Sequence, residues 1–202
     1  MEQINKVKSI SIWIFIVPFV AVNTCLILIT QFQELFPNQE DIIHNTIPYF
    51  DGGASISRTA RPYPSWLVFK PAMFLTSFLL IKYWLFNKAI ASSFEKNHKY
   101  INKFVYFGIA SAIALTVHSI FLGIKFDNDF YKLFRRVVML MFIIFEIVAQ
   151  AYLVATLYSF KDKLSKYINK TYLTLKLYLV SILIVVEVIS VLIISFPGNN
   201  CL

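Results

Sequence analysis

VVMLMFIIFEIVAQAYLVATLYSF, residues 137–160, is the stretch of this sequence that decides the fold. It contains one charged side chain, Glu146. An α-helix of this length is long enough to cross about 30 Å of hydrocarbon. An ionisable group in such a helix costs a few kcal/mol or more unless it is paired, neutralised or in contact with water. The stretch therefore predicts a membrane-spanning helix, and it marks Glu146 as a candidate functional residue.

Four other stretches are similarly long and apolar. They lie at about 9–30, 71–90, 104–124 and 177–196. Hydrophobic residues make up 58% of the chain, which is more than a soluble domain of this size could bury. None of the stretches alternates apolar and polar residues with a period of two, which argues against a membrane β-barrel. The sequence predicts a single all-α domain, a polytopic membrane helix bundle with about five transmembrane helices.

Lysine and arginine are distributed unevenly between the two predicted sides of the membrane. Eleven lie in the N-terminal arm and in the second and fourth links, whereas seven lie on the opposite side. The positive-inside rule then places the N-terminus in the cytoplasm and the C-terminus outside, in a plasma or inner membrane. The net charge of +8 lies mostly next to the membrane, where it suits anionic lipid headgroups and not nucleic acid. We expect membrane lipids as partners and leave open a second membrane protein.

The sequence contains no pattern that indicates a metal or a cofactor. Cys25 lies within the first predicted helix and Cys201 near the opposite end of the chain, with no CxxC motif and no Cys/His cluster. A thiol redox site or a structural zinc site is therefore not expected. The P-loop, GxGxxG, HExxH and GxSxG motifs are also absent from the sequence, which removes the required parts of many standard enzyme mechanisms.

One connection, residues 31–70, is much longer than the others. A loop of this length without a helix or strand pattern of its own is usually functional or disordered, and its prolines and aromatic residues favour an ordered loop. Asp51, Ser57, Arg58 and Arg61 are candidate ligand-binding residues, because guanidinium groups suit bidentate capture of a phosphate or carboxylate. The alternative is that Asp51 pairs with one arginine and closes the loop on itself.

Within this loop, Pro48, Tyr49, Asp51 and Gly52 follow a Pro-aromatic-x-Asp-Gly pattern. The segment resembles the Pro-Tyr-Ile-Ser-Asp-Thr-Gly type segment of the Frag1/DRAM/Sfk1 family of multi-span membrane proteins. The resemblance covers this segment and the spacing of the helices. Members of that family usually have six helices with both ends inside, and residues 57–61 are not part of their pattern. The resemblance implies a lipid-associated role or a role in membrane homeostasis.

Three ionisable groups lie at similar depths in the predicted helices. At 1.5 Å per residue, His118, Glu146 and Glu187 are about 9–14 Å from the outer ends of their helices. Gln150 lies one turn below Glu146 on the same face. Lipid offers such groups no partner, so we expect them to face the bundle interior. The sequence predicts a polar pocket lined by these four residues, roofed by residues 48–66 and open to the outside. The alternative is that each forms a separate hydrogen bond between helices.

These residues are compatible with three functions. The first is a non-catalytic protein that binds a lipid or an anionic headgroup in the outward-facing pocket. The second is an intramembrane enzyme acting on a lipid or isoprenoid, with His118 and Glu146 as an acid/base pair. It requires His118, Glu146 or Glu187 to lie within about 3–4 Å of one another or of Asp51. The third is a small proton-coupled carrier, which requires a polar line that continues from Gln150 to the cytoplasm.

Overall fold

The computed structural model describes residues 2–38, 56–124, 128–164, 167 and 169–195, and every structural statement below concerns these residues. Five long helices and three short helical segments make up the described chain. They are α1 (Glu2–Gln31), the 3₁₀ turn η1 (Gln33–Leu35), α2 (Ile56–Thr59), α3 (Ser65–Phe94), α4 (Ile101–Phe121), α5 (Asp129–Ser159), α6 (Lys161–Leu164) and α7 (Lys170–Ser195). The five long helices are each long and apolar enough to cross a membrane. The prediction of a helical membrane bundle is confirmed.

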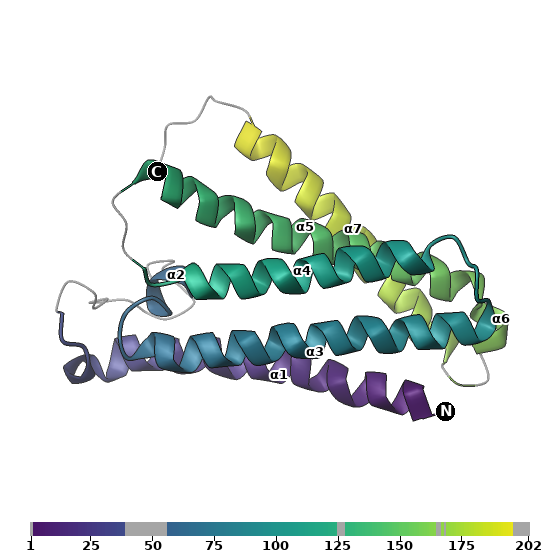
Figure 1. The fold of residues 1–202 in the computed structure, drawn as a ribbon, viewed down its shortest axis with the longest axis horizontal. Coiled ribbons are helices and arrows are strands. Elements are labelled where there is room, and N and C mark those ends of the chain that lie inside the picture. The colour runs from purple at the N-terminus through teal and green to yellow at the C-terminus, as the bar shows by residue number, and fades with distance from the viewer. Residues whose placement is uncertain (1, 39–55, 125–127, 165–166, 168, 196–202) are drawn as a thin grey trace.

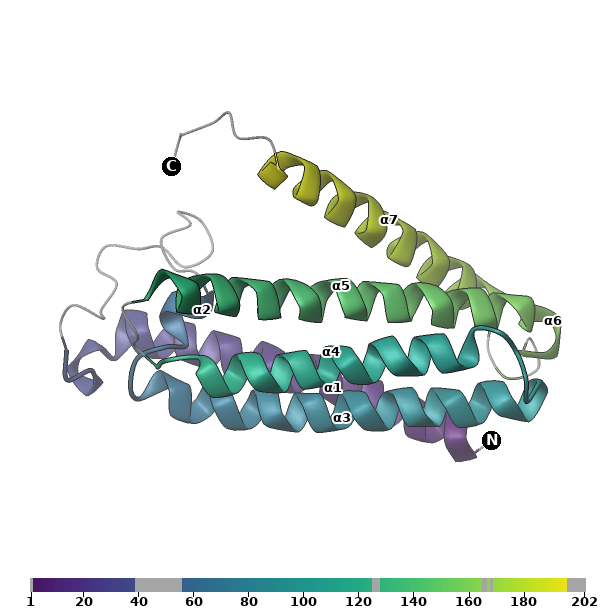
Figure 2. The ribbon, with the colours of Figure 1, turned by 45° about the horizontal axis from the view of Figure 1, so that its top comes forward.

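The long helices pack in a simple order. α1 lies along α3, α3 along α4, and α4 along α5. α7 packs along α5 near its own beginning and then diverges from it, as Figure 2 shows. We call one end of the bundle the α2 end, because α2 lies there with the start of α3, the end of α4 and the start of α5 (Figure 1). The opposite end, which carries α6 and the chain's N-terminus, is the α6 end.

The helices extend beyond the apolar stretches that predicted them. All five begin between three and eight residues earlier than expected, because helical hydrogen bonding continues into segments polar enough for the headgroup region. α4 instead ends early, at Phe121. Gly123 follows with a φ of 89°, a conformation that costs a residue with a side chain about 1–2 kcal/mol. A Cβ at Gly123 would also lie 3.1 Å from the carbonyl oxygen of Arg61.

The long connection 31–70 is not free of secondary structure, contrary to the sequence prediction. It contains η1 and α2, and its last six residues already belong to α3. The end of α2 and the residue after it are buried, since Thr59 and Ala60 are 1% and 0% exposed. Cys25 Sγ in α1 approaches the carbonyl oxygen of Ser65 at 3.4 Å. This end of the bundle is therefore covered by the chain that enters α3.

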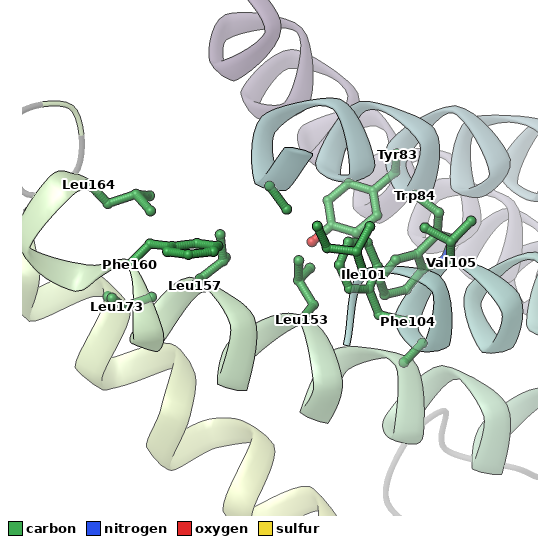
Figure 3. Packing of buried hydrophobic residues seen from close by; sticks show 12 residues of the cluster. Tyr83, Trp84, Ile101, Phe104, Val105, Leu153, Leu157, Phe160, Leu164 and Leu173 are labelled. Atoms are coloured by element: carbon green, nitrogen blue, oxygen red, sulfur yellow. The ribbon is translucent and has the colours of Figure 1, made fainter. Parts of the chain in front are cut away.

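An aromatic and aliphatic cluster fills the α6 half of the bundle (Figure 3). At its centre, Trp84 and Phe104 are both 0% exposed, with ring centroids 6.1 Å apart. Gly108 of α4 lies directly against the indole, because an added Cβ would overlap the Trp84 ring. The cluster continues through Leu153 to the residues around Leu164 in α6. Among the described residues, the interior of this half is therefore mainly apolar, with Asn87 and Thr156 as buried polar side chains.

Candidate functional site

A cavity of about 620 Å³ lies in the α2 half of the bundle, and we call it the apolar groove. Its lining comes from α1, α2, α3, α5 and the end of α4, and only Thr76, His118 and Glu146 are polar. The lining residues are Ile14, Pro18, Val22, Ile56, Phe69, Met73, Thr76, Leu80, Leu115, His118, Leu122, Met139, Phe142 and Glu146. α1 and α5 are not among the closely packed helix pairs, so the groove opens between them.

A second cavity of about 670 Å³, the basic pocket, adjoins the groove at the α2 end. Its lining brings together four cationic side chains, from the segment before α3 and from the first two turns of α5. The lining residues are Arg61, His118, Lys132, Arg135, Arg136, Met139 and Leu140. His118 and Met139 line both cavities. The apolar cavity and the cationic cavity therefore lie next to each other.

Three nitrogens around the basic pocket are buried without a hydrogen-bond partner. They are Nε of Arg61, Nε of Arg135 and Nδ1 of His118. Among the described residues, no carboxylate lies within 4.0 Å of the guanidiniums of Arg61, Arg135 or Arg136. Arg61 and Arg135 are near enough to repel each other electrostatically. Since a buried donor without a partner costs about 1–3 kcal/mol, the pocket has unused capacity to bind an anion.

The neighbouring elements fix where these arginines lie. The guanidinium of Arg135 lies over the ring of Tyr131, 5.9 Å from its centroid. The Tyr131 hydroxyl donates a hydrogen bond to the carbonyl oxygen of Phe121 at 2.6 Å. This bond ties the start of α5 to the end of α4. On the other side of the pocket, the backbone of Arg61 rests against Gly123, where there is no side chain to displace it.

Glu146 lies at the inner end of the apolar groove and is held by two helices. Its Oε2 accepts a hydrogen bond from Ser111 Oγ of α4 at 2.7 Å, and its Oε1 accepts one from Gln150 Nε2 at 3.0 Å. The indole nitrogen of Trp84 interacts with the carboxylate electrostatically but lacks hydrogen-bond geometry. Glu146 is thus part of a polar contact between α4 and α5. This contact agrees with the alternative prediction, in which each polar residue forms a separate hydrogen bond between helices.

The structure brings together some of the residues expected to share a pocket. His118 and Glu146 line the same groove, and Gln150 joins them through its bond to Glu146. Glu187 lies on α7, which packs along α5, and it lines neither cavity. No described hydrogen bond or ion pair joins His118 to Glu146 or to Glu187. Two of the four residues expected in one pocket therefore line the groove, and Gln150 contacts one of them without lining it.

The candidate residues of the long loop also differ in whether they line a cavity. Arg61 lines the basic pocket, whereas Arg58 is exposed on α2 and lines neither cavity. Ser57 lies within α2, and Asp51 is outside the described residues. Of the roof predicted at 48–66, the described part supplies Ile56 to the groove and Arg61 to the pocket.

Arg135 and Arg136 are not among the candidate ligand-binding residues predicted from the sequence. The structure places both in the wall of the basic pocket. A signal was present in the sequence, because these arginines precede one predicted helix and Arg61 precedes another at the same end of the bundle. Ser111 gave no comparable signal, since a serine in a membrane helix usually bonds its own backbone. Here its single hydroxyl proton is within reach of both the carbonyl oxygen of Gly108, at 2.8 Å, and Glu146 Oε2, at 2.7 Å.

Comparisons with family models, curated proteins and solved structures found no match to this chain. The resemblance to the Frag1/DRAM/Sfk1 family remains a prediction from the sequence. In the described part of the chain, no group of three or more His, Cys, Asp or Glu side chains could hold a metal ion.

Proposed function

We propose that the protein binds an amphipathic lipid at the α2 end, with an anionic headgroup in the basic pocket and hydrocarbon in the apolar groove. The observation that carries the proposal is the adjacency of the two cavities, whose linings share His118 and Met139. A ligand that fills both must have an anionic part and a hydrocarbon part next to each other. That combination is the chemistry of a lipid.

The length of the groove favours a lipid over a soluble ligand. Along α3 the lining runs from Phe69 to Leu80, a distance of about 16 Å at 1.5 Å per residue. One leaflet contributes about half of a hydrocarbon core that is ~30 Å thick. A lipid with its headgroup in the basic pocket would therefore extend its chain to about the middle of the membrane, where Glu146 closes the groove.

The same contacts favour binding over catalysis. His118 and Glu146 both line the groove, but Glu146 is engaged by Ser111 and Gln150. An acid/base pair would need the imidazole and the carboxylate within direct reach of each other or of a shared substrate atom. Binding requires only the cationic and apolar walls.

A carrier function is less well supported than binding. A permeation path would have to continue from Gln150 to the α6 end. That half of the bundle is filled by Trp84, Phe104 and the aliphatic residues around them. Chains of Asp, Glu or His side chains mark most proton relays in membranes, and the described cluster contains none of these, although its Tyr83 hydroxyl contacts Lys176.

We further propose that the α2 end lies outside the cell, so that the site serves the outer leaflet of a plasma or inner membrane. The excess of lysine on the α6 side supports this orientation. The role in membrane homeostasis comes from the family resemblance alone.

The test is lipid binding by a variant without two of the pocket's arginines. Wild-type protein and the double variant Arg61→Ala/Arg135→Ala are titrated with phosphatidylglycerol and with phosphatidylcholine of the same chains, by native mass spectrometry. Hydrogen bonds to charged groups are worth about 1.5–3 kcal/mol each, and about 1.4 kcal/mol is a tenfold change in affinity. We expect the double variant to bind phosphatidylglycerol at least tenfold more weakly than wild type does.

Arg58→Ala is the matched control, because Arg58 is exposed on α2 beside the pocket but lines neither cavity. It should bind phosphatidylglycerol as wild type does. Thermal unfolding shows that the double variant is folded, and a small fall in its midpoint is expected from the lost contact between Arg135 and the Tyr131 ring. Unchanged phosphatidylglycerol affinity in a folded double variant would overturn the proposed function.

A further inference from the structure

The last turn of α4 accepts hydrogen bonds from the two helices beside it. The last carbonyl groups of a helix have no partner within that helix, so they need donors from elsewhere. The carbonyl oxygen of Phe121 accepts a hydrogen bond from the Tyr131 hydroxyl of α5 at 2.6 Å. The carbonyl oxygen of Ile120 accepts one from Lys70 Nζ of α3 at 3.3 Å. The beginnings of α3 and α5 are therefore both attached to one turn of α4.

The end of α4 is itself held by packing on two sides. Leu122, directly after the helix, is 1% exposed and belongs to a buried cluster that includes Ala60 from the segment before α3. The ring of Phe121 meets the rings of Tyr131 and Phe134 edge-on, with centroids 6.2 Å and 5.3 Å apart. Because closely packed interiors deform little, this turn is a firm support for the segments attached to it.

Two arginines of the basic pocket take their places from this turn. The carbonyl oxygen of Arg61 would lie 3.1 Å from a Cβ at Gly123, so the backbone comes this close because Gly123 has no side chain. Arg135 follows Tyr131 by four residues, which places it one turn later on the same face of α5. Its guanidinium lies over the Tyr131 ring, 5.9 Å from the centroid. Arg61 and Arg135 are far apart in the sequence, yet they line one pocket.

From these contacts we infer that Gly123 and Tyr131 are positioning residues of the proposed lipid site. Neither lines the apolar groove or the basic pocket; Gly123 acts through Arg61, and Tyr131 acts through Arg135. A guanidinium binds phosphate best through two parallel hydrogen bonds, whose geometry a small displacement disturbs. The inference rests on the proposed function and names what holds its two arginines together.

The test begins with one change at each positioning residue. Tyr131→Phe removes the hydroxyl and keeps the ring below Arg135. Gly123→Asn adds a Cβ facing the Arg61 carbonyl, and asparagine tolerates a positive φ better than most residues do. Native mass spectrometry measures the affinity for phosphatidylglycerol and for phosphatidylcholine of the same chains, and thermal unfolding shows that each variant is folded.

Both variants should bind the anionic lipid more weakly. One hydrogen bond between membrane helices corresponds to about a threefold change in affinity, so we expect Tyr131→Phe to weaken phosphatidylglycerol binding by about this factor. Gly123→Asn should weaken it at least as much, and phosphatidylcholine binding should change less in both variants. Tyr63→Phe is the matched control, because it removes an exposed tyrosine hydroxyl at the same end of the bundle, outside both cavities. It should bind as wild type does.

Combination with the arginine variants separates positioning from a general loss of structure, since residues that act through one another have non-additive effects. In an Arg135→Ala background, Tyr131→Phe should have no further effect on phosphatidylglycerol affinity, whereas Gly123→Asn should still weaken it. In an Arg61→Ala background the two roles should be reversed. Residues that only stabilise the fold would weaken binding in both backgrounds, and that result would overturn the inference.

The remaining outcomes distinguish this inference from the proposed function. If Arg61→Ala and Arg135→Ala weaken phosphatidylglycerol binding but Tyr131→Phe and Gly123→Asn do not, the positioning roles are wrong and the proposed function stands. If the affinity depends on neither arginine, the proposed function is wrong and the positioning roles are wrong with it.

Discussion

The hydrogen bonds of Glu146 give the groove a fixed inner end. Ser111 and Gln150 donate to the two carboxylate oxygens from α4 and α5. Such bonds between membrane helices contribute about 0.6 kcal/mol on average and up to about 1.7. Loss of the acceptor costs more than the bond alone when a donor is left buried and unpaired. The carboxylate therefore stabilises the α4–α5 contact whether or not a ligand is bound.

We expect Glu146→Leu to lower the free energy of unfolding by about 1–3 kcal/mol, because the Gln150 amide loses its partner. Unfolding in mixed micelles, followed by circular dichroism, measures this change. The double variant Glu146→Leu/Gln150→Leu should recover part of the loss, since no unpaired amide remains. Glu187→Leu is the control and should not destabilise, because Oε1 of Glu187 has no partner to lose. If the double variant is no more stable than Glu146→Leu, the loss of stability does not come from the unpaired Gln150 amide.

At the residue scale, the sequence predicted how deep a side chain lies in the membrane better than it predicted which other side chains lie next to it. The positions of His118 and Glu146 within their helices were enough to expect them at one level, and they line one groove. Glu187 is at a similar depth but on α7, whose main packing partner is α5. Depth follows from a residue's place in its own helix. Which helices are neighbours depends on packing between them, and a single sequence of apolar stretches contains little information about that.

At the scale of elements, α7 differs from the other four long helices. Only Leu173 and Val180 among its described side chains are buried. One polar contact joins α7 to α3, from Lys176 Nζ to the Tyr83 hydroxyl at 3.1 Å, and the ammonium group also lies 5.9 Å from the centroid of that ring. Tyr83 thus helps to hold the beginning of α7, together with the buried Leu173 and the ion pair between Lys170 and Asp162.

We expect Tyr83→Phe to increase amide hydrogen exchange in residues 170–189 by about threefold to tenfold, which corresponds to the loss of one hydrogen bond between membrane helices. Exchange is followed by mass spectrometry of the protein in nanodiscs. The variant keeps the aromatic ring in the cluster around Trp84, so exchange in α3 and α4 should not change. Tyr178→Phe, on the exposed face of α7, is the control. Equal exchange in both variants would show that the hydroxyl does not hold α7.

The existence of each long helix was predictable, but its ends were not. Apolar length locates the part of a helix inside hydrocarbon, whereas the polar turns of α5 before Val137 are helical through backbone hydrogen bonds that hydropathy does not detect. Those turns carry Arg135 and Arg136. The start of α5 and the two arginines that α5 contributes to the basic pocket were therefore missed for the same physical reason. The early end of α4 depends on the positive φ of Gly123, which a glycine permits but does not require.

At the scale of the whole molecule, the proposed orientation can be checked directly. In a Cys25→Ser/Cys201→Ser background, Asp129→Cys and Lys163→Cys place single thiols at the α2 end and the α6 end, where both native side chains are exposed. We expect a membrane-impermeant maleimide to label the thiol of Asp129→Cys in intact cells. The thiol of Lys163→Cys should be labelled only after permeabilisation, because the lysine-rich side is placed in the cytoplasm. The reverse pattern would move the proposed site to the inner leaflet.

The opening of the groove between α1 and α5 determines how a lipid would reach the site. A lipid already in the leaflet could move sideways between the two helices without passing through water, so its bulk aqueous concentration would not govern binding. The relevant quantity would be its mole fraction among the surrounding lipids. Even a modest intrinsic affinity would then give occupancy that rises and falls with the composition of that leaflet. The protein would in this way report the local abundance of a minor membrane component.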